Sequence, residues 1–237
     1  MFAELKKIEA EWRARMHKAL SFGGVNDYVE IPDSPSLNIT KEITLAAWVN
    51  IKLPKIIGWF ICKYRPYTGM RTYSLGLTNN ELRLLIGNET DNAIDLRTPI
   101  TTGLHFVVGT YRSGGGSNLF IDGELKATGS DVGDIATNDL AVLIGAGYAG
   151  DGTVRYYFNG LITQVSIYNR ALSESEIKYL YHNPFDPIDP DHLVLWLNPA
   201  GIDVANSKWW DLSGKDNHGT IYGATEVKLV EDEVIVT

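Results

Sequence analysis

The chain has 237 residues and a net charge of −8, with 29 Asp and Glu against 21 Lys and Arg. This acidic balance argues against nucleic-acid binding, because there is no basic surplus to displace phosphate counterions. The single cysteine excludes an internal disulfide framework, and no apolar run approaches the roughly 20 residues of a membrane span. Charges between Glu4 and Arg15 interrupt any signal-peptide core, so we expect synthesis in the cytoplasm without that export route.

Residues 1–18 are predicted to form an amphipathic helical arm. Its apolar stripe consists of Phe2, Leu5, Ile8, Trp12 and Met16. Opposite charges four residues apart support the helix on its other face. The stripe needs a partner, and both the chain's own sheets and an oligomer seam fit; the mixed charge makes a membrane surface a poorer partner.

From residue 19 to residue 182 the chain alternates short apolar strands with turn residues, which predicts an all-β, antiparallel sandwich. Within the strand Ile43–Ile51, Trp48 is expected in the core, and the near-continuous apolar run around Cys62 predicts a strand covered on both faces with a buried thiol. Asp122 and Gly123 supply the positive-φ positions of a hairpin turn. Asp122 and Glu124 are therefore predicted to be turn and rim residues and not a catalytic pair.

The stretch from Tyr157 to Tyr181 predicts a strand followed by a short helix near 173–181. Its first half alternates apolar and polar residues. In its second half Ser173 and Glu176 have the spacing of a capping box, in which each side chain satisfies a backbone amide of the first helical turn. Pro184 ends the helix.

This stretch, with its pattern F-x-G-x-I-x-x-V-x-I-Y-N-R-A-L-S-x-x-E-I, resembles the last strand and helix of the concanavalin A-like, laminin G-like jelly-roll family. Residues 18–39 (KALSFGGVNDYVEIPDSPSLNI) and 119–129 (LFIDGELKATG) agree in order and spacing. The resemblance implies a jelly-roll β-sandwich of a mostly non-catalytic type that binds glycans or proteins at a loop rim, often with calcium. The E-x-D-x-x-E strand of related glycoside hydrolases is absent.

After the sandwich, residues 183–192 carry a proline at every third position and predict a stiff, extended linker. Residues 193–237 resemble the module with which the family normally begins, a first strand followed by D-x-S-G-x-x-N-H-G-T-I. Its place at the C-terminus leaves two favoured interpretations: it completes its own sandwich as a circular permutation, or it completes a neighbouring subunit by strand exchange. A stub of a second domain fits less well, because its tryptophans would be exposed.

Two loops are candidate ligand sites. The segment from Lys63 to Thr72 lacks strand alternation and combines aromatic and basic side chains, and a second glycine-rich loop spans Gly145 to Gly152. Exposed aromatic rings beside arginines could stack on sugars or anchor a partner protein, against the alternative of ordinary loops. The candidate residues are Tyr64, Arg65, Tyr67, Arg71 and Tyr148.

A calcium site is a further candidate, because the resemblance implies rim acids near residues 24–27 and 158–164. Two of the family's acids read Asn26 and Thr163 here. Oxygen ligands remain at Asn26, Asp27, Asn159 and Gln164, although calcium prefers carboxylates. The alternative is that Asn26 and Asp27 only form the turn.

Catalytic groupings are missing from the sequence: there is no metal-ligand spacing of histidines and no G-x-S-x-G elbow. The predicted function is a non-catalytic surface-assembly or adhesion module, a virion structural component such as a capsid decoration or tail protein. Its partners would be further copies of the chain and a larger assembly. The alternative is a lectin-like glycan-binding module, and a glycoside hydrolase fits least.

Overall fold

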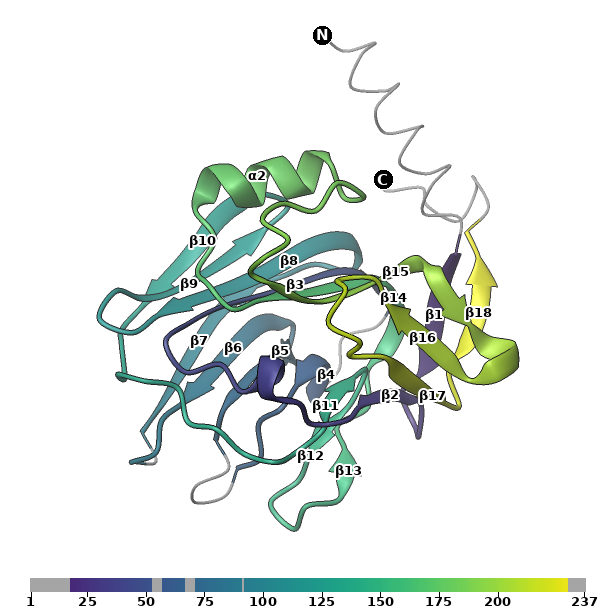
Figure 1. Ribbon diagram of the computed structural model, residues 1–237, viewed down its shortest axis with the longest axis horizontal. Coiled ribbons are helices and arrows are strands. Elements are labelled where there is room, and N and C mark those ends of the chain that lie inside the picture. Colours follow the sequence, from purple (N-terminus) through teal and green to yellow (C-terminus); the bar gives the residue numbers. More distant parts are fainter. Residues whose placement is uncertain (1–17, 53–56, 67–70, 91, 230–237) are drawn as a thin grey trace, which may run out of the picture.

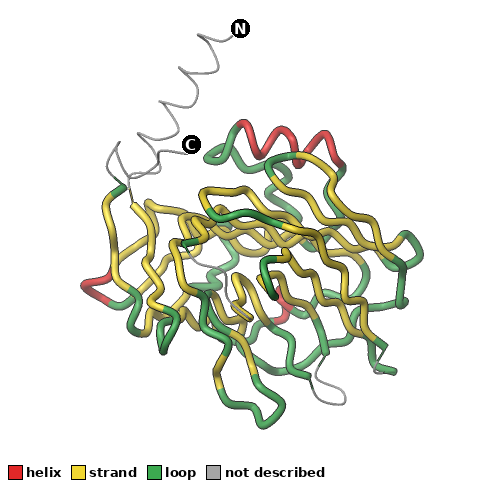
Figure 2. Tube along the Cα trace, turned by 180° about the vertical axis from the view of Figure 1, so that it is seen from behind, coloured by secondary structure: helices red, strands yellow, loops and turns green. Residues whose placement is uncertain are grey.

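The computed structural model describes residues 18–52, 57–66, 71–90 and 92–229. The predicted helical arm, apart from residue 18, and Tyr67 lie outside the described residues. Within them, the predicted antiparallel jelly-roll sandwich is confirmed. The strands form two layers, and seen from behind they make up most of the trace (Figure 2).

The first layer contains five strands in the order β10-β9-β8-β3-β14. Their bounds are β10 Glu124–Gly129, β9 Gly116–Ile121, β8 Gly103–Arg112, β3 Glu42–Ile51 and β14 Asn159–Tyr168. Two strands share the remaining edge of β14: β1 (Lys18–Gly23) pairs with its first half and β15 (Leu193–Asp203) with its second. The strand predicted in the Tyr157 to Tyr181 stretch is thus central to this layer.

The second layer runs in the order β2-β11-β4-β5-β6-β7. Its strands are β2 Tyr28–Ile31, β11 Val142–Ile144, β4 Ile57–Cys62, β5 Tyr73–Thr78, β6 Glu81–Gly87 and β7 Ala93–Pro99. A small hairpin of β12 (Gly147–Tyr148) and β13 (Val154–Arg155) stands beside it. A short 3-10 turn, η1 (Pro35–Leu37), follows β2.

The C-terminal segment connects the two layers. From β15 the chain continues through the 3-10 turn η2 (Val204–Asn206) to β16 (Lys208–Asp211) and β17 (Gly219–Tyr222), and β17 pairs with β2. The last of the described strands, β18 (Thr225–Lys228), pairs with β1. In this chain residues 193–228 therefore pair with strands of their own sandwich (Figure 1).

The D-x-S-G-x-x-N motif explains how this segment is fixed. The Asp211 carboxylate accepts hydrogen bonds from the backbone amides of Trp196, Ser213 and Asn217. The buried Asn217 amide donates to the Ser36 hydroxyl at 2.8 Å and the Val194 carbonyl at 2.7 Å, and its oxygen accepts from Ser34 at 2.7 Å. The motif thereby ties β15, the β16–β17 loop and η1 together.

Among the described residues, three apolar clusters stabilise the layers. The largest fills the space between them, and Trp209 of β16 is fully buried in it. A second cluster lies on the outer side of the first layer, where Trp48 and Phe106 meet Ile177 and Leu180 of helix α2 (Glu174–His182). Strand β3 is consequently covered on both faces, because its side chains alternate between these two clusters. Trp48 is 4% exposed, as expected.

The predicted capping box at the start of α2 is present. Ser173 is the N-cap, its side chain accepts from the Glu176 amide, and the Glu176 carboxylate accepts from the Ser173 amide at 2.8 Å. Arg170 pairs with Glu176 and with Asp189 of the following segment. None of the described helices is long and apolar enough to cross a membrane.

The proline-rich segment 183–192 differs from the expected extended linker. Two turns fold it, with the Asp186 amide bonded to the Asn183 carbonyl and the His192 amide to the Asp189 carbonyl. Phe185 and Ile188 pack against the cluster under α2. Proline stiffness holds only the backbone locally, whereas the burial of these two side chains decides that the segment returns along the sheet.

Candidate functional site

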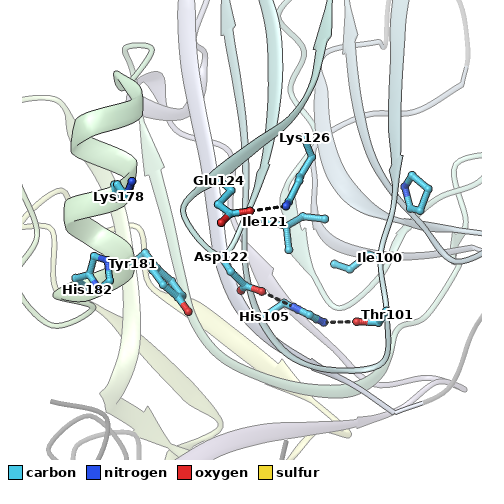
Figure 3. A pocket seen from close by; sticks show the side chains of 11 residues that line it. Ile100, Thr101, His105, Ile121, Asp122, Glu124, Lys126, Lys178, Tyr181 and His182 are labelled. Carbon is cyan, nitrogen blue, oxygen red and sulfur yellow. Dashed lines mark hydrogen bonds and ion pairs between the residues drawn. The ribbon is translucent and has the colours of Figure 1, made fainter. Parts of the chain in front are cut away.

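A pocket of about 660 Å³ opens between α2 and the edge of the first layer (Figure 3). Three parts of the chain line it: the segment from the end of β7 to the start of β8, the β9–β10 hairpin and the last turns of α2. The lining residues are Pro99, Ile100, Thr101, His105, Ile121, Asp122, Glu124, Lys126, Lys178, Tyr181 and His182. A volume of this size lies within the usual range of small-molecule sites, roughly 300–1,000 Å³.

His105 is held rigidly on one side of the pocket. Its Nδ1 lies 2.8 Å from an Asp122 carboxylate oxygen, and its Nε2 lies 3.1 Å from the Thr101 hydroxyl. The second Asp122 oxygen accepts from the Phe106 backbone amide at 2.8 Å. The predicted hairpin turn places Asp122 there, because Asp122 has φ of 54° and Gly123 of 78°. Both nitrogens of His105 and both oxygens of Asp122 are therefore already engaged.

Tyr181 forms the aromatic wall of the pocket. Its ring stacks on Trp48 at 5.7 Å between centroids, and Trp48 in turn stacks on Phe106 at 5.2 Å. On the hairpin side, a Cβ at Gly123 would lie 3.3 Å from the Tyr181 Cβ. The bare glycine therefore lets the hairpin approach the base of the Tyr181 side chain, at its Cβ, Cγ and Cδ1 atoms, while Trp48 supports one face of the ring.

Charged side chains form the rim. Lys126 bonds Glu124 at 2.6 Å along β10, and this ion pair lowers the pKa of the exposed Glu124 carboxyl. Lys178 projects from α2 on the opposite side and pairs with no carboxylate among the described residues (Figure 3). It is exposed to solvent, so its ammonium group is available to a ligand.

Of the pocket residues, only Asp122 and Glu124 were predicted from the sequence, as turn and rim residues, and both positions are confirmed. The rest of the pocket was not predicted. One signal was present. Lys178, Tyr181 and His182 are three and four residues apart, so a helix must place them on one face. No local sequence pattern, however, indicates that this face of the helix packs against the β9–β10 hairpin.

The structure brings the two predicted ligand loops together. Arg65 donates through Nη2 to the Gly150 carbonyl at 2.8 Å, and Gly152 lies against the Arg65 guanidinium. Tyr64 and Tyr148 belong to one apolar cluster with Trp59 of β4. The predicted residues thus share one neighbourhood beside the second layer, with Tyr67 outside the described residues.

Their exposure differs from the expectation. Tyr64 is 8% and Tyr148 9% exposed, and the Tyr148 hydroxyl donates to the Ala141 carbonyl at 3.0 Å. Arg71 lies against Gly87 of β6, and its charge opposes the rise that burial causes in the pKa of Tyr64. The prediction that these tyrosines are exposed for stacking is therefore wrong: both rings are buried in an apolar cluster with Trp59, Leu85 and Leu143.

The predicted calcium ligands do not converge as a set. Asp27 accepts the Gly23 amide at 2.5 Å, and Gly23 pairs with Asn159, so Asn26, Asp27 and Asn159 occupy one corner. Gln164 lies five residues further along β14, roughly 16 Å away in an extended strand. There it is buried, and its side-chain amide donates to the Pro184 carbonyl at 2.8 Å.

This spacing corrects the prediction for Gln164, because one strand cannot bring both ends of its length to one ion. Asp27 is the only carboxylate among the four candidates. Within the part of the chain that the structure describes, no three His, Cys, Asp or Glu side chains form a group that could hold a metal.

Several solved structures share this fold. A proposed carbohydrate-binding protein from Bacteroides ovatus has a TM-score of 0.70 at 18% identity, over 91% of this chain and 60% of that one. The ligand-binding domain of botulinum neurotoxin serotype D, in complex with N-acetylneuraminic acid, has a TM-score of 0.54 at 16% identity, over 70% of this chain and 42% of that one. A heptameric SAP-like pentraxin from Limulus polyphemus gives 0.52 at 13%, over 70% of this chain and 82% of that one.

At these identities the likeness concerns the fold. The chain spans less than two thirds of the first two of these proteins. A search of curated protein sequences found no match. The family model described as the concanavalin A-like lectin/glucanases superfamily, however, matches residues 22–178, which include both layers, the β9–β10 hairpin and most of α2. The chain therefore belongs to the concanavalin A-like lectin/glucanases superfamily.

Proposed function

We propose that this chain is a non-catalytic carbohydrate-binding module and that its glycan site is the pocket between α2 and the β9–β10 hairpin. The observation that carries the proposal is the composition of the pocket: a fixed aromatic ring, Tyr181, faces a rim of hydrogen-bonding charged groups in a volume of about 660 Å³. The lectin-type fold and the carbohydrate ligands named for similar structures support it.

A sugar ring fits these surroundings chemically. A pyranose has an apolar face that packs on an aromatic ring and a rim of hydroxyls that both donate and accept hydrogen bonds. Tyr181 supplies the ring, and Lys178, Glu124 and Lys126 supply donors and acceptors around it. Charged groups of this kind form stronger hydrogen bonds than neutral ones and so orient the ligand.

The same geometry argues against glycoside hydrolysis. Such hydrolysis uses two free carboxyl groups, one of them an acid with a raised pKa. Here Asp122 bonds His105 and the Phe106 amide, and the Glu124 pKa is lowered by Lys126. The Asp122 carboxylate is already fully hydrogen-bonded and the pKa of Glu124 is lowered, so this pair does not match the arrangement of a hydrolase, and we infer that the pocket binds its ligand without cleaving it.

A glycan array, followed by titration of the best oligosaccharide, tests the proposal. We expect Lys178→Ala to weaken binding about 5- to 30-fold, the loss of one charged hydrogen bond of about 1–2 kcal/mol. Lys215→Ala, at an exposed lysine outside the pocket, should leave binding unchanged. A blank array, or equal affinity of wild type and Lys178→Ala, contradicts the proposal.

The assembly role inferred from the sequence, as part of a virion surface, stays a prediction. Residues 193–228 pair within their own chain in this structure, so an assembly would use another surface or would exchange the segment between copies. Light scattering of the full chain decides the matter: a stable mass of three or more chains supports the role, and the mass of a single chain contradicts it.

A further inference from the structure

The outer face of β16, β17 and β2 carries aromatic and polar side chains in an ordered arrangement. Along each of these strands buried residues alternate with residues that reach solvent. The outward residues are Lys208 and Trp210 of β16, Thr220 and Tyr222 of β17, and Tyr28 and Glu30 of β2. We call this surface the β16–β17–β2 face. It lies away from α2 and shares no residue with the pocket (Figure 1).

One end of the β16–β17–β2 face is a group of tyrosines. Tyr222 pairs with Tyr28 across the strands, and their rings stack at 4.7 Å with an angle of 16°. Tyr157 adds a third ring at 6.4 Å from Tyr28. Tyr222 remains 41% exposed, so the stack presents part of its aromatic surface to solvent.

The other end is Trp210. Its indole meets the His218 ring edge-on at 4.8 Å, and its Nε1 donates to an Asp203 oxygen at 3.4 Å. It is 39% exposed although these two contacts position it. An exposed indole that is held in one orientation can stack on a ring of a ligand.

Between the two aromatic ends lies a polar row. Lys208 pairs with Thr220 and Thr220 with Glu30 in the strand register, so the three side chains form a line across the strands. The Lys208 ammonium donates to the Thr220 hydroxyl at 2.9 Å. Asp203 of β15, the register partner of Lys208, extends the row with a second carboxylate, so the row offers hydrogen bonds to a ligand without attracting an anionic one.

The length of the β16–β17–β2 face indicates how large a ligand it can hold. From His218, under Trp210, to Tyr222 is four residues of extended chain, or roughly 13 Å. This span exceeds one pyranose ring and suits a short oligosaccharide stretch. A protein–protein interface would instead have a contiguous apolar centre and a polar rim. The β16–β17–β2 face has the reverse arrangement, with aromatic ends and a polar middle.

We propose that the β16–β17–β2 face is a second carbohydrate-binding site, which holds an extended, neutral polysaccharide. Sugar rings stack on Trp210 and Tyr222, and Glu30, Thr220 and Lys208 bond the hydroxyls between them. The C-terminal segment supplies two of the three strands, β16 and β17. It therefore both links the layers and forms this site.

Affinity electrophoresis in gels that contain soluble neutral polysaccharides (a mixed-linkage β-glucan, a xyloglucan and a galactomannan) tests the proposal. We expect at least one of them to retard the wild-type chain. Trp210→Ala and Tyr222→Ala should each weaken binding up to about tenfold, the loss of one aromatic contact. Tyr179→Ala, which removes an equally exposed tyrosine (41%) from α2, is the matched control and should not change retardation.

The outcomes also separate the two sites. Retardation that persists in Lys178→Ala but falls in Trp210→Ala supports a site independent of the pocket. Retardation that falls in Lys178→Ala and persists in both aromatic variants overturns the inference while the pocket proposal stands. No retardation by any of the three polysaccharides, or a wild-type mass of two chains that Trp210→Ala reduces to one, also overturns it.

Discussion

Replacement of Asn217 by alanine tests how the C-terminal segment is attached to the sandwich. The Asn217 side chain is 4% exposed and makes three hydrogen bonds, to Ser34, Ser36 and the Val194 carbonyl. These partners belong to the η1 region and to β15, more than 20 residues away along the chain. The alanine variant removes all three bonds without adding bulk.

The loss of unfolding free energy in this variant depends on whether the three partners of Asn217 find other hydrogen bonds. Ser34 and Ser36 already lie 2.9 Å apart and can bond each other, but the Val194 carbonyl loses the bond donated by Asn217 in the interior. Net losses of about 1 kcal/mol for a hydrogen bond and 1–3 kcal/mol for an orphaned buried group sum to about 2–4 kcal/mol. For a chain of this length, 3 kcal/mol corresponds to a fall in Tm of roughly 6–12 °C.

Urea unfolding monitored by tryptophan fluorescence measures this loss, because Trp209 is buried beside the motif. Asn206→Ala, at an exposed asparagine in η2, is the matched control and should cost less than about 1 kcal/mol. If Asn217→Ala were no more destabilising than Asn206→Ala, the hydrogen-bonded motif would not be what attaches the segment to the sandwich.

Three further predictions concern single groups. Hydrogen bonding from Arg170 lowers the pKa of Glu176 to about 2, so the stabilising contribution of Glu176 is present above pH 4.5 and is lost as the pH falls toward 2. Urea titrations should therefore show a smaller pH dependence of stability for Glu176→Gln than for the exposed control Glu174→Gln. An equal pH dependence in the two variants would count against the ion pair. Burial raises the pKa of the Cys62 thiol to about 12, so a thiol reagent at pH 8 should label it only in urea, and rapid labelling of the folded chain would disprove the burial. Because Asp27 is the only carboxylate among the four candidate calcium ligands, we expect no rise in Tm at about 0.1 mM calcium. A rise that Asp27→Asn abolishes would establish a calcium site there.

Local sequence patterns were sufficient wherever neighbouring residues along the chain decide the outcome. The capping box at Ser173 and Glu176 and the hairpin turn at Asp122 and Gly123 are confirmed, because each depends on a few adjacent backbone groups. The alternation within β3 and β14 and the three family blocks were likewise enough to predict the jelly-roll sandwich. Cys62 is buried as expected, at 1% exposure.

The ligand sites were less predictable, because their geometry depends on segments far apart in sequence. Lys178 and Tyr181 could be placed on one helix face, but not opposite Asp122, since only the packing of α2 over β8–β10 brings them together. The lack of alternation in its segment predicts an exposed Tyr64, whereas the ring packs in an apolar cluster with Leu85 and Leu143 of the second layer.

The strand pattern, the turns, the helix cap and the family of this protein could be predicted from the sequence alone, since these follow from residue types at short spacing. Which side chains reach solvent depends on tertiary packing. Tyr64 and Tyr148 are buried in an apolar cluster with residues of other segments, while no described segment covers Trp210 and Tyr222 to the same extent. Long-range packing therefore selects the surfaces on which this fold can bind a ligand.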